Sequence, residues 1–156
     1  MIRFCLAAVA IFLIVTGGAR AADFDARAAH GKFIEAFNKR DWGTVKSILT
    51  SDGVFHRANG EQVFVGPEAI VDRFSSTIGA PDQWNVKFAR LDSTAQLTGK
   101  DGRVVERGNF AVTAGADDKS CYAGSYMMTW VPQDAGRWGL QLFAWQDVET
   151  DLATCR

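Results

Sequence analysis

DGVFHRANGEQVFVGPEAIVDRFSSTIG, residues 52–79, predicts a tight β-hairpin running directly into an amphipathic helix, around which the other elements are arranged. Asn59-Gly60 separates two short apolar runs, at 54–57 and 62–65. Since both residues of this pair tolerate positive φ, they favour the type I′ turn that suits twisted strands. The sequence therefore predicts two antiparallel strands joined at residues 59–60.

A helix is predicted to begin immediately after this hairpin, at Gly66-Pro67-Glu68. Proline suits the first helical position because its missing N–H has no partner there. The carboxylate of Glu68 interacts favourably with the positive end of the helix dipole. Ile70, Phe74 and Ile78 recur every four residues and give this helix one apolar face.

Two further helices are predicted before the hairpin. Asp23 is a candidate N-cap for a long helix over residues 24–40, whose apolar residues fall near one face. Asp41 is a candidate N-cap for a shorter helix, which Ser51-Asp52-Gly53 ends.

Four strands are predicted after the third helix. Trp84, Val86 and Phe88 alternate with polar residues, with a bulge expected near Ala89-Arg90, and Lys100-Asp101-Gly102 is a second hairpin turn. The element order, without internal repeats, predicts a single α+β domain with a long antiparallel meander. The four strands are expected at residues 84–98, 103–113, 120–131 and 138–148.

The first 21 residues have the pattern of a secretory signal peptide. Met1-Ile2-Arg3 carries a positive charge, residues 4–15 are apolar, and Ala19-Arg20-Ala21 resembles a cleavage site. The apolar run is about half of the ~20 residues needed to span a bilayer. We therefore expect an exported domain, residues 22–156, in the periplasm or outside the cell, with no stable membrane insertion after cleavage.

Composition restricts the partners and cofactors. The formal net charge is −1 and no basic patch stands out, so nucleic acid is not an expected partner. The chain has two histidines and no carboxylates clustered at ligand spacing, so no metal or other cofactor is expected. After export, Cys121 and Cys155 are expected to pair in an oxidising compartment, the alternative being two free thiols.

The last two long strands carry apolar side chains on both faces, whereas a sheet with one wet face alternates more cleanly. One face is therefore expected to pack under the helices and the other to meet a second protomer, giving a homodimer. The side chains are Tyr122, Tyr126, Met128 and Trp130 on one face, and Met127 and Val131 on the other.

A series of short motifs resembles the nuclear transport factor 2-like superfamily, which includes ketosteroid isomerase, and most closely its small bacterial SnoaL-like members. The resemblance implies a cone: a curved antiparallel sheet wrapped around three helices, with a pocket at one end and frequent dimerisation through the sheet. The motifs are Phe33-Ile34-Glu35-Ala36-Phe37-Asn38-x-x-Asp41, Leu49-x-x-Asp52, Asn59-Gly60, Val65-Gly66-x-x-x-Ile70, Gly124-x-Tyr126-x-x-x-Trp130, Gly136-x-Trp138-x-Leu140 and Trp145.

Enzymes of this superfamily need a carboxylate or a histidine inside the apolar cone, where it can exchange protons. His56 and Arg57 are adjacent on one predicted strand, so at most one of them faces the pocket. His56 is the candidate general base, and Arg57 is the candidate for holding an anionic ligand. The other expected pocket residues are Phe37, Phe74, Tyr126, Trp130 and Trp145.

The remaining charged residues are expected outside the pocket. His30 on the first helix and Glu106 on a strand are both expected to be solvated, and Asp147 is expected to meet solvent near the mouth. The almost wholly apolar run at 140–145 weakens the case for proton transfer and favours an apolar ligand.

Three functions stay open. The first is binding of a small apolar molecule without transforming it. The second is a cofactor-free isomerase, lyase or hydrolase that uses His56 or a carboxylate. The third is a protein-interaction domain whose cone is filled by its own side chains. A cavity of several hundred Å³ separates the first two from the third.

Overall fold

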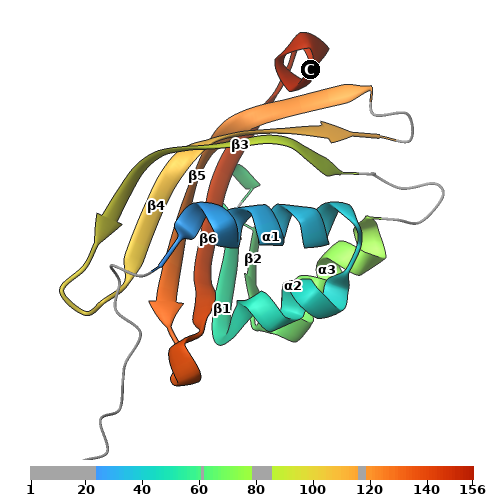
Figure 1. The fold of residues 1–156 in the computed structure, drawn as a ribbon. Helices are drawn as coiled ribbons and strands as arrows, with labels where there is room; N and C mark the ends of the chain where they lie inside the picture. Colours follow the sequence, from blue (N-terminus) through green and yellow to red (C-terminus); the bar gives the residue numbers. More distant parts are fainter. Residues whose placement is uncertain (1–23, 61, 79–85, 116–118) are drawn as a thin grey trace, which may run out of the picture.

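The structure, a computed structural model, describes residues 24–60, 62–78, 86–115 and 119–156, so the expected signal peptide lies outside the described residues. The predicted order of helices and strands is confirmed (Figure 1). The elements are α1 (Ala26–Asn38), α2 (Trp42–Ile48), β1 (Leu49–Arg57), β2 (Gln62–Val65), α3 (Pro67–Thr77), β3 (Lys87–Thr98), β4 (Val104–Ala114), β5 (Ser120–Pro132) and β6 (Trp138–Thr150), with short 3₁₀ turns η2 (Ala58–Gly60), η3 (Asp134–Gly136) and η4 (Leu152–Cys155).

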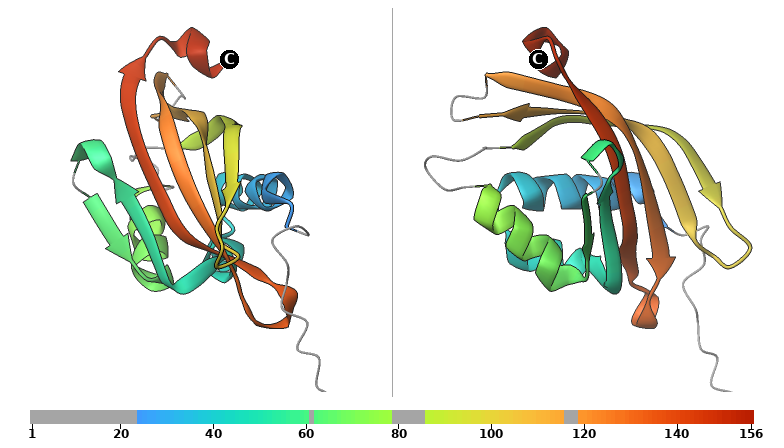
Figure 2. Two further views of the ribbon diagram at one scale, coloured as in Figure 1. Left: turned by 90° about the vertical axis from the view of Figure 1, so that its left-hand side faces the viewer. Right: turned by 180° about the vertical axis from the view of Figure 1, so that it is seen from behind.

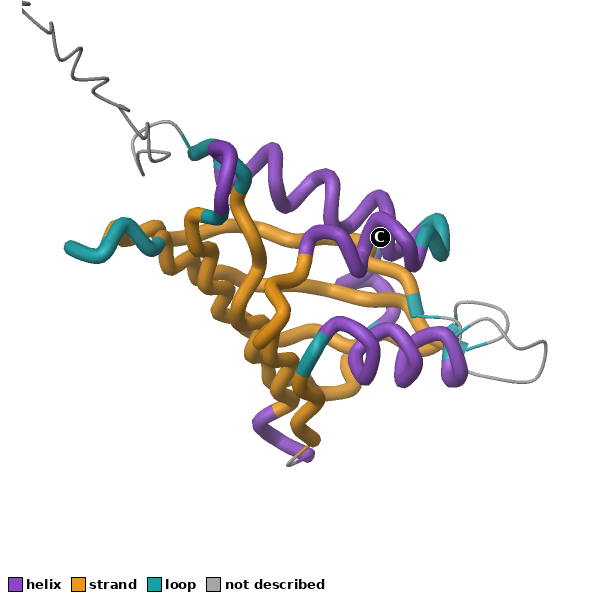
Figure 3. Tube along the Cα trace, turned by 90° about the horizontal axis from the view of Figure 1, so that it is seen from below, coloured by secondary structure: helices purple, strands orange, loops and turns teal. Residues whose placement is uncertain are grey.

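The described strands form one sheet in the order β2-β1-β6-β5-β4-β3. The sheet is strongly curved, and the three helices lie on its concave side (Figures 1 and 2). Seen from below, the strands form one wall and the helices lie along the other (Figure 3). β1 and β6 pair in parallel, so the sheet is mixed, with antiparallel pairing at its other contacts. The α+β cone expected from the sequence is confirmed, but the expected wholly antiparallel sheet is wrong, because β1 and β6 run in parallel.

Local signals account for how the helices begin. The carboxylate of Asp25 accepts from the backbone N–H of Ala28 at 3.0 Å, so Asp25 caps α1 and the expected cap at Asp23 is wrong. Asp41 caps α2 as predicted, accepting from the N–H of Thr44 at 3.0 Å. Pro67 occupies the start of α3, directly after Gly66, whose φ of 87° favours glycine.

The two predicted hairpins differ in their turns. Arg57 pairs with Gln62, so the β1–β2 connection is longer than the expected two-residue turn at Asn59-Gly60 and contains the η2 turn. The β3–β4 hairpin has its glycine at positive φ as expected, with Gly102 at 81°. The predicted bulge is present, since the register of β3 shifts between Phe88 and Arg90.

The core lies between α1 and the concave face of the sheet. The buried ring of Phe33 on α1 packs edge-on against Phe55 and Phe143, with ring centroids 6.1 and 5.8 Å apart. Burial of a large apolar side chain stabilises the fold by roughly 1.5–3 kcal/mol. Within the described residues, no helix is long and apolar enough to cross a membrane.

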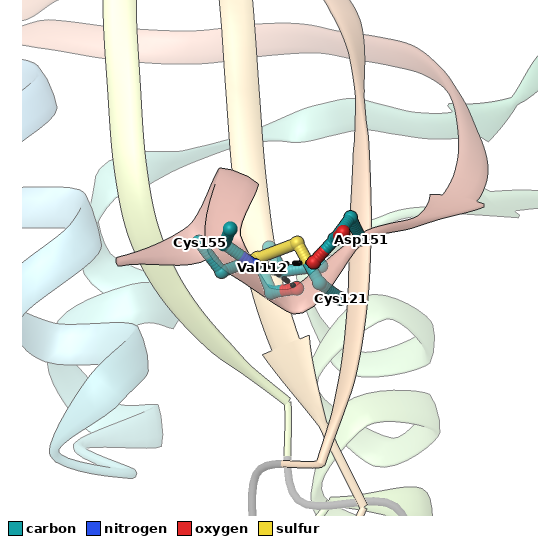
Figure 4. Close-up of a disulfide and its surroundings, with 5 residues drawn as sticks. Val112, Cys121, Asp151 and Cys155 are labelled. Atoms are coloured by element: carbon teal, nitrogen blue, oxygen red, sulfur yellow. Dashed lines mark hydrogen bonds between the residues drawn. A yellow bond between two sulfur atoms is a disulfide. The ribbon is translucent and has the colours of Figure 1, made fainter.

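A disulfide joins Cys121 on β5 to Cys155 in η4, with 6.0 Å between the Cα atoms (Figure 4). Asp151 caps η4 by accepting from the N–H of Ala153 at 2.9 Å. The sulfur of Cys155 lies 3.2 Å from the carbonyl oxygen of Val112 on β4. The C-terminal segment is therefore held against the neighbouring strands β5 and β4.

Candidate functional site

A cavity of about 460 Å³ lies between the helices and the concave face of the sheet. It occupies the end of the sheet where β1, β4 and β6 finish and β5 begins. Its apolar lining is Phe37, Phe64, Phe74, Ile78, Val86, Phe88, Phe110, Val112, Ala114, Phe143 and Trp145, and its polar lining is Arg57, Gln62, Arg73, Ser76, Tyr122 and Asp147.

The register of β1 decides which of its two candidate residues enters the cavity. Phe55 pairs with Phe143 and Arg57 pairs with Trp145, and these four side chains face the concave side. His56 lies between Phe55 and Arg57, and successive side chains of a strand point to opposite faces. His56 is therefore on the convex face, and the general base expected in the pocket is not there. Arg57 lines the cavity.

Arg57 and Asp147 form an ion pair at the polar side of the cavity. The Nε atom of Arg57 lies 2.9 Å from Oδ1 of Asp147. The side chains are 34% and 10% exposed, so Asp147 is mostly shielded from solvent, contrary to expectation. The side-chain amide of Asn59 donates to the backbone carbonyl of Asp147 and holds η2 against β6. The pair thus links β1 to the end of β6.

Two more polar side chains lie at this side. Burial raises the pKa of the Tyr122 hydroxyl, and the negative charges of Glu149 and Asp147 raise it further. Tyr122 therefore keeps its proton at neutral pH and is a hydrogen-bond donor in the cavity wall. The guanidinium of Arg73 on α3 lies 5.7 Å from the centre of the Phe64 ring.

Phe37, Phe74 and Trp145, expected in the pocket, line the cavity, but Tyr126 and Trp130 do not. Both belong to the concave face of β5 further toward its end, where α1 covers the sheet and buries them. Trp130 contacts the ring of Phe24, 5.5 Å away between centroids. These two residues build the closed end of the cone rather than its pocket.

A buried polar cluster occupies this closed end. His30 is 5% exposed and Glu106 is 1% exposed, so the expectation that both are solvated is wrong. Nδ1 of His30 lies 3.0 Å from Oε1 of Glu106, and Nε2 lies 2.7 Å from the sulfur of Met128. The hydroxyl of Tyr126 donates to the same Glu106 oxygen at 3.3 Å. Both ring nitrogens of His30 are thus engaged within the core.

Glu106 is charged in this cluster. Burial raises the pKa of its carboxyl, but the hydrogen bonds from His30, Ser93 and Tyr126 and the charge of His30 together outweigh burial, and the pKa lies below its ordinary value. The charged carboxylate in turn raises the pKa of Tyr126, whose burial is the larger cause. Neither His30 nor Glu106 lines the cavity.

The spacing of His30 and Glu106 from their apolar neighbours in the sequence indicates that both are buried. His30 lies four residues after Ala26 and three before Phe33, which are buried positions of α1. Glu106 alternates in β4 with Val104 and Phe110, whose side chains are buried on the same face. His30 and Glu106 are polar, which favours a position at the surface, but their spacing from buried neighbours indicates that both side chains face the core.

The cavity is suited to binding a small molecule, but few of its lining side chains could take part in catalysis. Its walls are mostly aromatic, its ionisable side chains are Arg57, Arg73, Asp147 and Tyr122, and no histidine is among the described lining residues. In the part of the chain that the structure describes, no three His, Cys, Asp or Glu side chains gather to hold a metal ion. Apolar contact with a few fixed polar groups is typical of small-molecule sites.

Comparisons with known proteins agree with this architecture. Among solved structures, ActVI-ORFA from Streptomyces coelicolor is 16% identical with a TM-score of 0.62, covering 78% of this chain and 92% of that one. An NTF2-like protein from Cytophaga hutchinsonii is 14% identical with a TM-score of 0.59, covering 80% and 100%. The hexachlorocyclohexane dehydrochlorinase LinA type 2 is 15% identical with a TM-score of 0.59, covering 80% and 84%. These similarities show the shared fold alone.

No protein with a curated description matches the chain. The family model for the SnoaL-like domain matches residues 31–139, which is more than half of the sequence and includes α2, α3 and strands β1 to β5. The chain therefore belongs to the SnoaL-like family, and it shares its fold with the NTF2-like protein from Cytophaga hutchinsonii.

Proposed function

We propose that this protein binds a small, largely apolar molecule in the cavity at the open end of the cone, and we assign it no reaction. The observation that carries the proposal is the cavity itself, about 460 Å³ and walled mainly by aromatic rings. Ligand pockets usually measure roughly 300–1,000 Å³ and are lined by apolar side chains with a few polar groups.

The apolar surface that a ligand buries in the cavity sets an upper limit on its affinity. A flat molecule that loses roughly 300 Å² of apolar surface on binding gains about 7.5 kcal/mol at ~25 cal/mol per Å². The loss of translational and rotational freedom opposes this gain. We therefore expect a simple apolar probe to bind more weakly than with a micromolar dissociation constant, since ~1 μM corresponds to about 8.2 kcal/mol.

The two alternatives have less support. A cofactor-free isomerase, lyase or hydrolase needs a proton-transfer group in the cavity, whereas His56 lies on the other face and Asp147 is paired with Arg57. The dehydrochlorinase LinA type 2 shares the fold, but one fold hosts many functions, so its activity does not transfer. A cone filled by its own side chains does not fit a cavity of about 460 Å³.

We also propose that the protein is exported and works in the periplasm or outside the cell. The apolar run at 4–15 with the cleavage-like Ala19-Arg20-Ala21 supports this, and so does the disulfide between Cys121 and Cys155. The homodimer through the sheet, expected from the sequence, stays a proposal.

Fluorescence of N-phenyl-1-naphthylamine, a neutral probe that brightens in apolar sites, tests the binding function. The wild-type protein is expected to bind it with saturation. Val112 lines the cavity, so Val112→Trp should fill it and weaken binding at least about tenfold. Val148 is 68% exposed on the opposite face of β6, and Val148→Trp is the matched control that should bind normally.

The outcomes separate clearly. Absence of saturable binding to the wild-type protein would overturn the proposed function, as would normal binding by a folded Val112→Trp variant. If Val112→Trp does not fold, Ser76→Trp replaces it, because Ser76 lines the cavity from an exposed position on α3 that tolerates a larger side chain.

A further inference from the structure

We propose that the bound molecule is an organic monoanion, an aromatic or aliphatic carboxylate, and that Arg57 binds its carboxylate group. This inference rests on the proposed function, because it names the ligand class of the same cavity. It goes beyond an apolar pocket by using the charged side chains that line one side of it.

The charges of the lining favour an anion. Arg57 is a fixed positive charge in the lining, and its Nη groups make no hydrogen bond to the described residues, so they can receive an anion. A ligand that enters displaces water from these groups, and Coulomb interactions strengthen as water leaves. A neutral, apolar ligand would desolvate the Nη donors of Arg57 without replacing the hydrogen bonds that these donors make to water.

Arg57 is held in a position to bind a carboxylate. Asp147 engages its Nε atom at 2.9 Å, and among the described residues the two Nη groups make no hydrogen bond. Because one edge of the guanidinium is fixed, less side-chain freedom is lost when the other edge binds a ligand. The Nη donors match the two oxygens of a carboxylate, and a charge-assisted pair of this kind is stronger than a neutral hydrogen bond.

Two neighbours support the same site. The phenol of Tyr122 lines the same side of the cavity. Arg73 is exposed, so its charge is screened and acts mainly on the approach of an anion to the cavity.

The rest of the cavity excludes a purely inorganic anion as the best ligand. Phe37, Phe88, Phe110 and Phe143 are among the rings that wall the space away from Arg57. An anion without an apolar body would leave these surfaces wet and would forgo their contribution to binding. A ligand with one anionic end and an apolar body matches both Arg57 and the aromatic walls of the cavity.

Two ligands of equal shape test the inference: naphthalene-2-carboxylate and naphthalene-2-carboxamide, each titrated calorimetrically into the full-length protein at pH 7 and low salt. The carboxylate is expected to bind at least about tenfold more tightly than the amide. Arg57→Gln should remove this preference, with carboxylate affinity falling about tenfold and amide affinity changing less than about twofold. Arg107→Gln, which removes an exposed guanidinium outside the cavity, should keep the preference.

Arg57→Gln leaves Asp147 without its partner, so the double variant Arg57→Gln/Asp147→Asn is a second test that removes both charges together. It should show the same loss of preference. Raising the salt concentration should weaken binding of the carboxylate and leave the amide unchanged.

Each result has one meaning. If N-phenyl-1-naphthylamine binds but the carboxylate binds no more tightly than the amide, the anion inference is overturned and the proposed function stands. If the probe fails to bind, the proposed function is overturned and the inference, which rests on it, falls with it. A folded Arg57→Gln variant that keeps the full preference would overturn the role of Arg57.

Discussion

His30 and Glu106 form an ion pair inside the core, with 3.0 Å between Nδ1 and Oε1 and almost no solvent exposure of either side chain. One residue comes from α1 and the other from β4, so the pair ties the helix to the concave face at the closed end of the cone. A buried pair of this kind adds little net stability over an apolar pair of similar volume, but loss of one partner is costly.

We therefore predict that His30→Leu lowers the free energy of unfolding by about 3–5 kcal/mol, because the Glu106 carboxylate is left buried without its partner. Urea denaturation followed by circular dichroism measures this. The double variant His30→Leu/Glu106→Leu should be more stable than His30→Leu alone. A double variant with the summed loss of the two single variants would show that the residues do not interact.

The same pair predicts an acid-sensitive contribution to stability. The pKa of Glu106 in the folded chain lies below its ordinary value of 4.5: burial raises it, but the hydrogen bonds from His30, Ser93 and Tyr126 and the charge of His30 together outweigh burial. The unfolded chain then binds more protons below about pH 4.5, so this stabilisation is complete above that pH. It is lost as the pH falls through the folded-state pKa.

Urea denaturation across pH 3–7 tests this for Glu106→Gln. Asp41 and Asp52 also have lowered pKa values, so they contribute to the loss of stability at low pH in wild type and in Glu106→Gln alike. The contribution of Glu106 is therefore read from the difference between the two stability curves. Wild type should lose more stability than Glu106→Gln as the pH falls, while the exposed control Glu149→Gln should follow wild type. Parallel curves for wild type and Glu106→Gln would contradict the prediction.

Local sequence signals predicted the elements but not the contents of the core. Asp41 and Pro67 act within one helical turn, so their roles are readable without knowing the tertiary structure. The choice between His56 and Arg57 depended on the pairing of β1 with β6, and those strands are far apart in the sequence. The pocket residue thus became identifiable only from the register.

The contact that buries His30 and Glu106 could not be predicted from the sequence, for a different reason. His30 and Glu106 occupy positions that otherwise hold apolar residues of the buried face. Either side chain alone would be unfavourable in the core, and their contact with each other offsets the cost of burial. A single sequence contains no information on which distant residue supplies that contact. Tyr126, expected in the pocket, instead donates its hydroxyl to Glu106 in this buried cluster.

The disulfide between Cys121 and Cys155 predicts a dependence on redox conditions. It closes a loop with a sequence separation of 34 residues. On the chain-entropy model its loss should cost about 3–4 kcal/mol. Cys155→Ser should therefore lower the urea midpoint, and wild type in reductant should behave like this variant.

Alkylation under denaturing, non-reducing conditions is the accompanying control, and the exported protein should show no alkylated thiol in the mass spectrum. Two alkylated thiols would contradict the bond in solution. An unchanged urea midpoint after verified reduction would contradict its contribution to stability.

The convex face of the sheet predicts self-association, which stays a proposal. A shallow hollow of about 410 Å³ lies over β4, β5 and β6, with Arg107, Met127 and Gln146 among its lining. Val148 on the same face is 68% exposed and Met127 lines the hollow, so this face presents apolar side chains to solvent. A stable dimer would cover roughly 800 Å² of each protomer.

Light scattering at micromolar concentration should therefore give about twice the mass of one chain. Met127→Lys places a charge in the hollow and should shift the protein to the mass of one chain, because burying an unpaired ammonium opposes association. Ser47→Lys, on the exposed side of α2, adds the same charge away from the sheet and should stay dimeric. A wild-type mass equal to one chain would contradict the dimer and leave the convex face a solvent-exposed surface, since the cavity on the concave side does not depend on it.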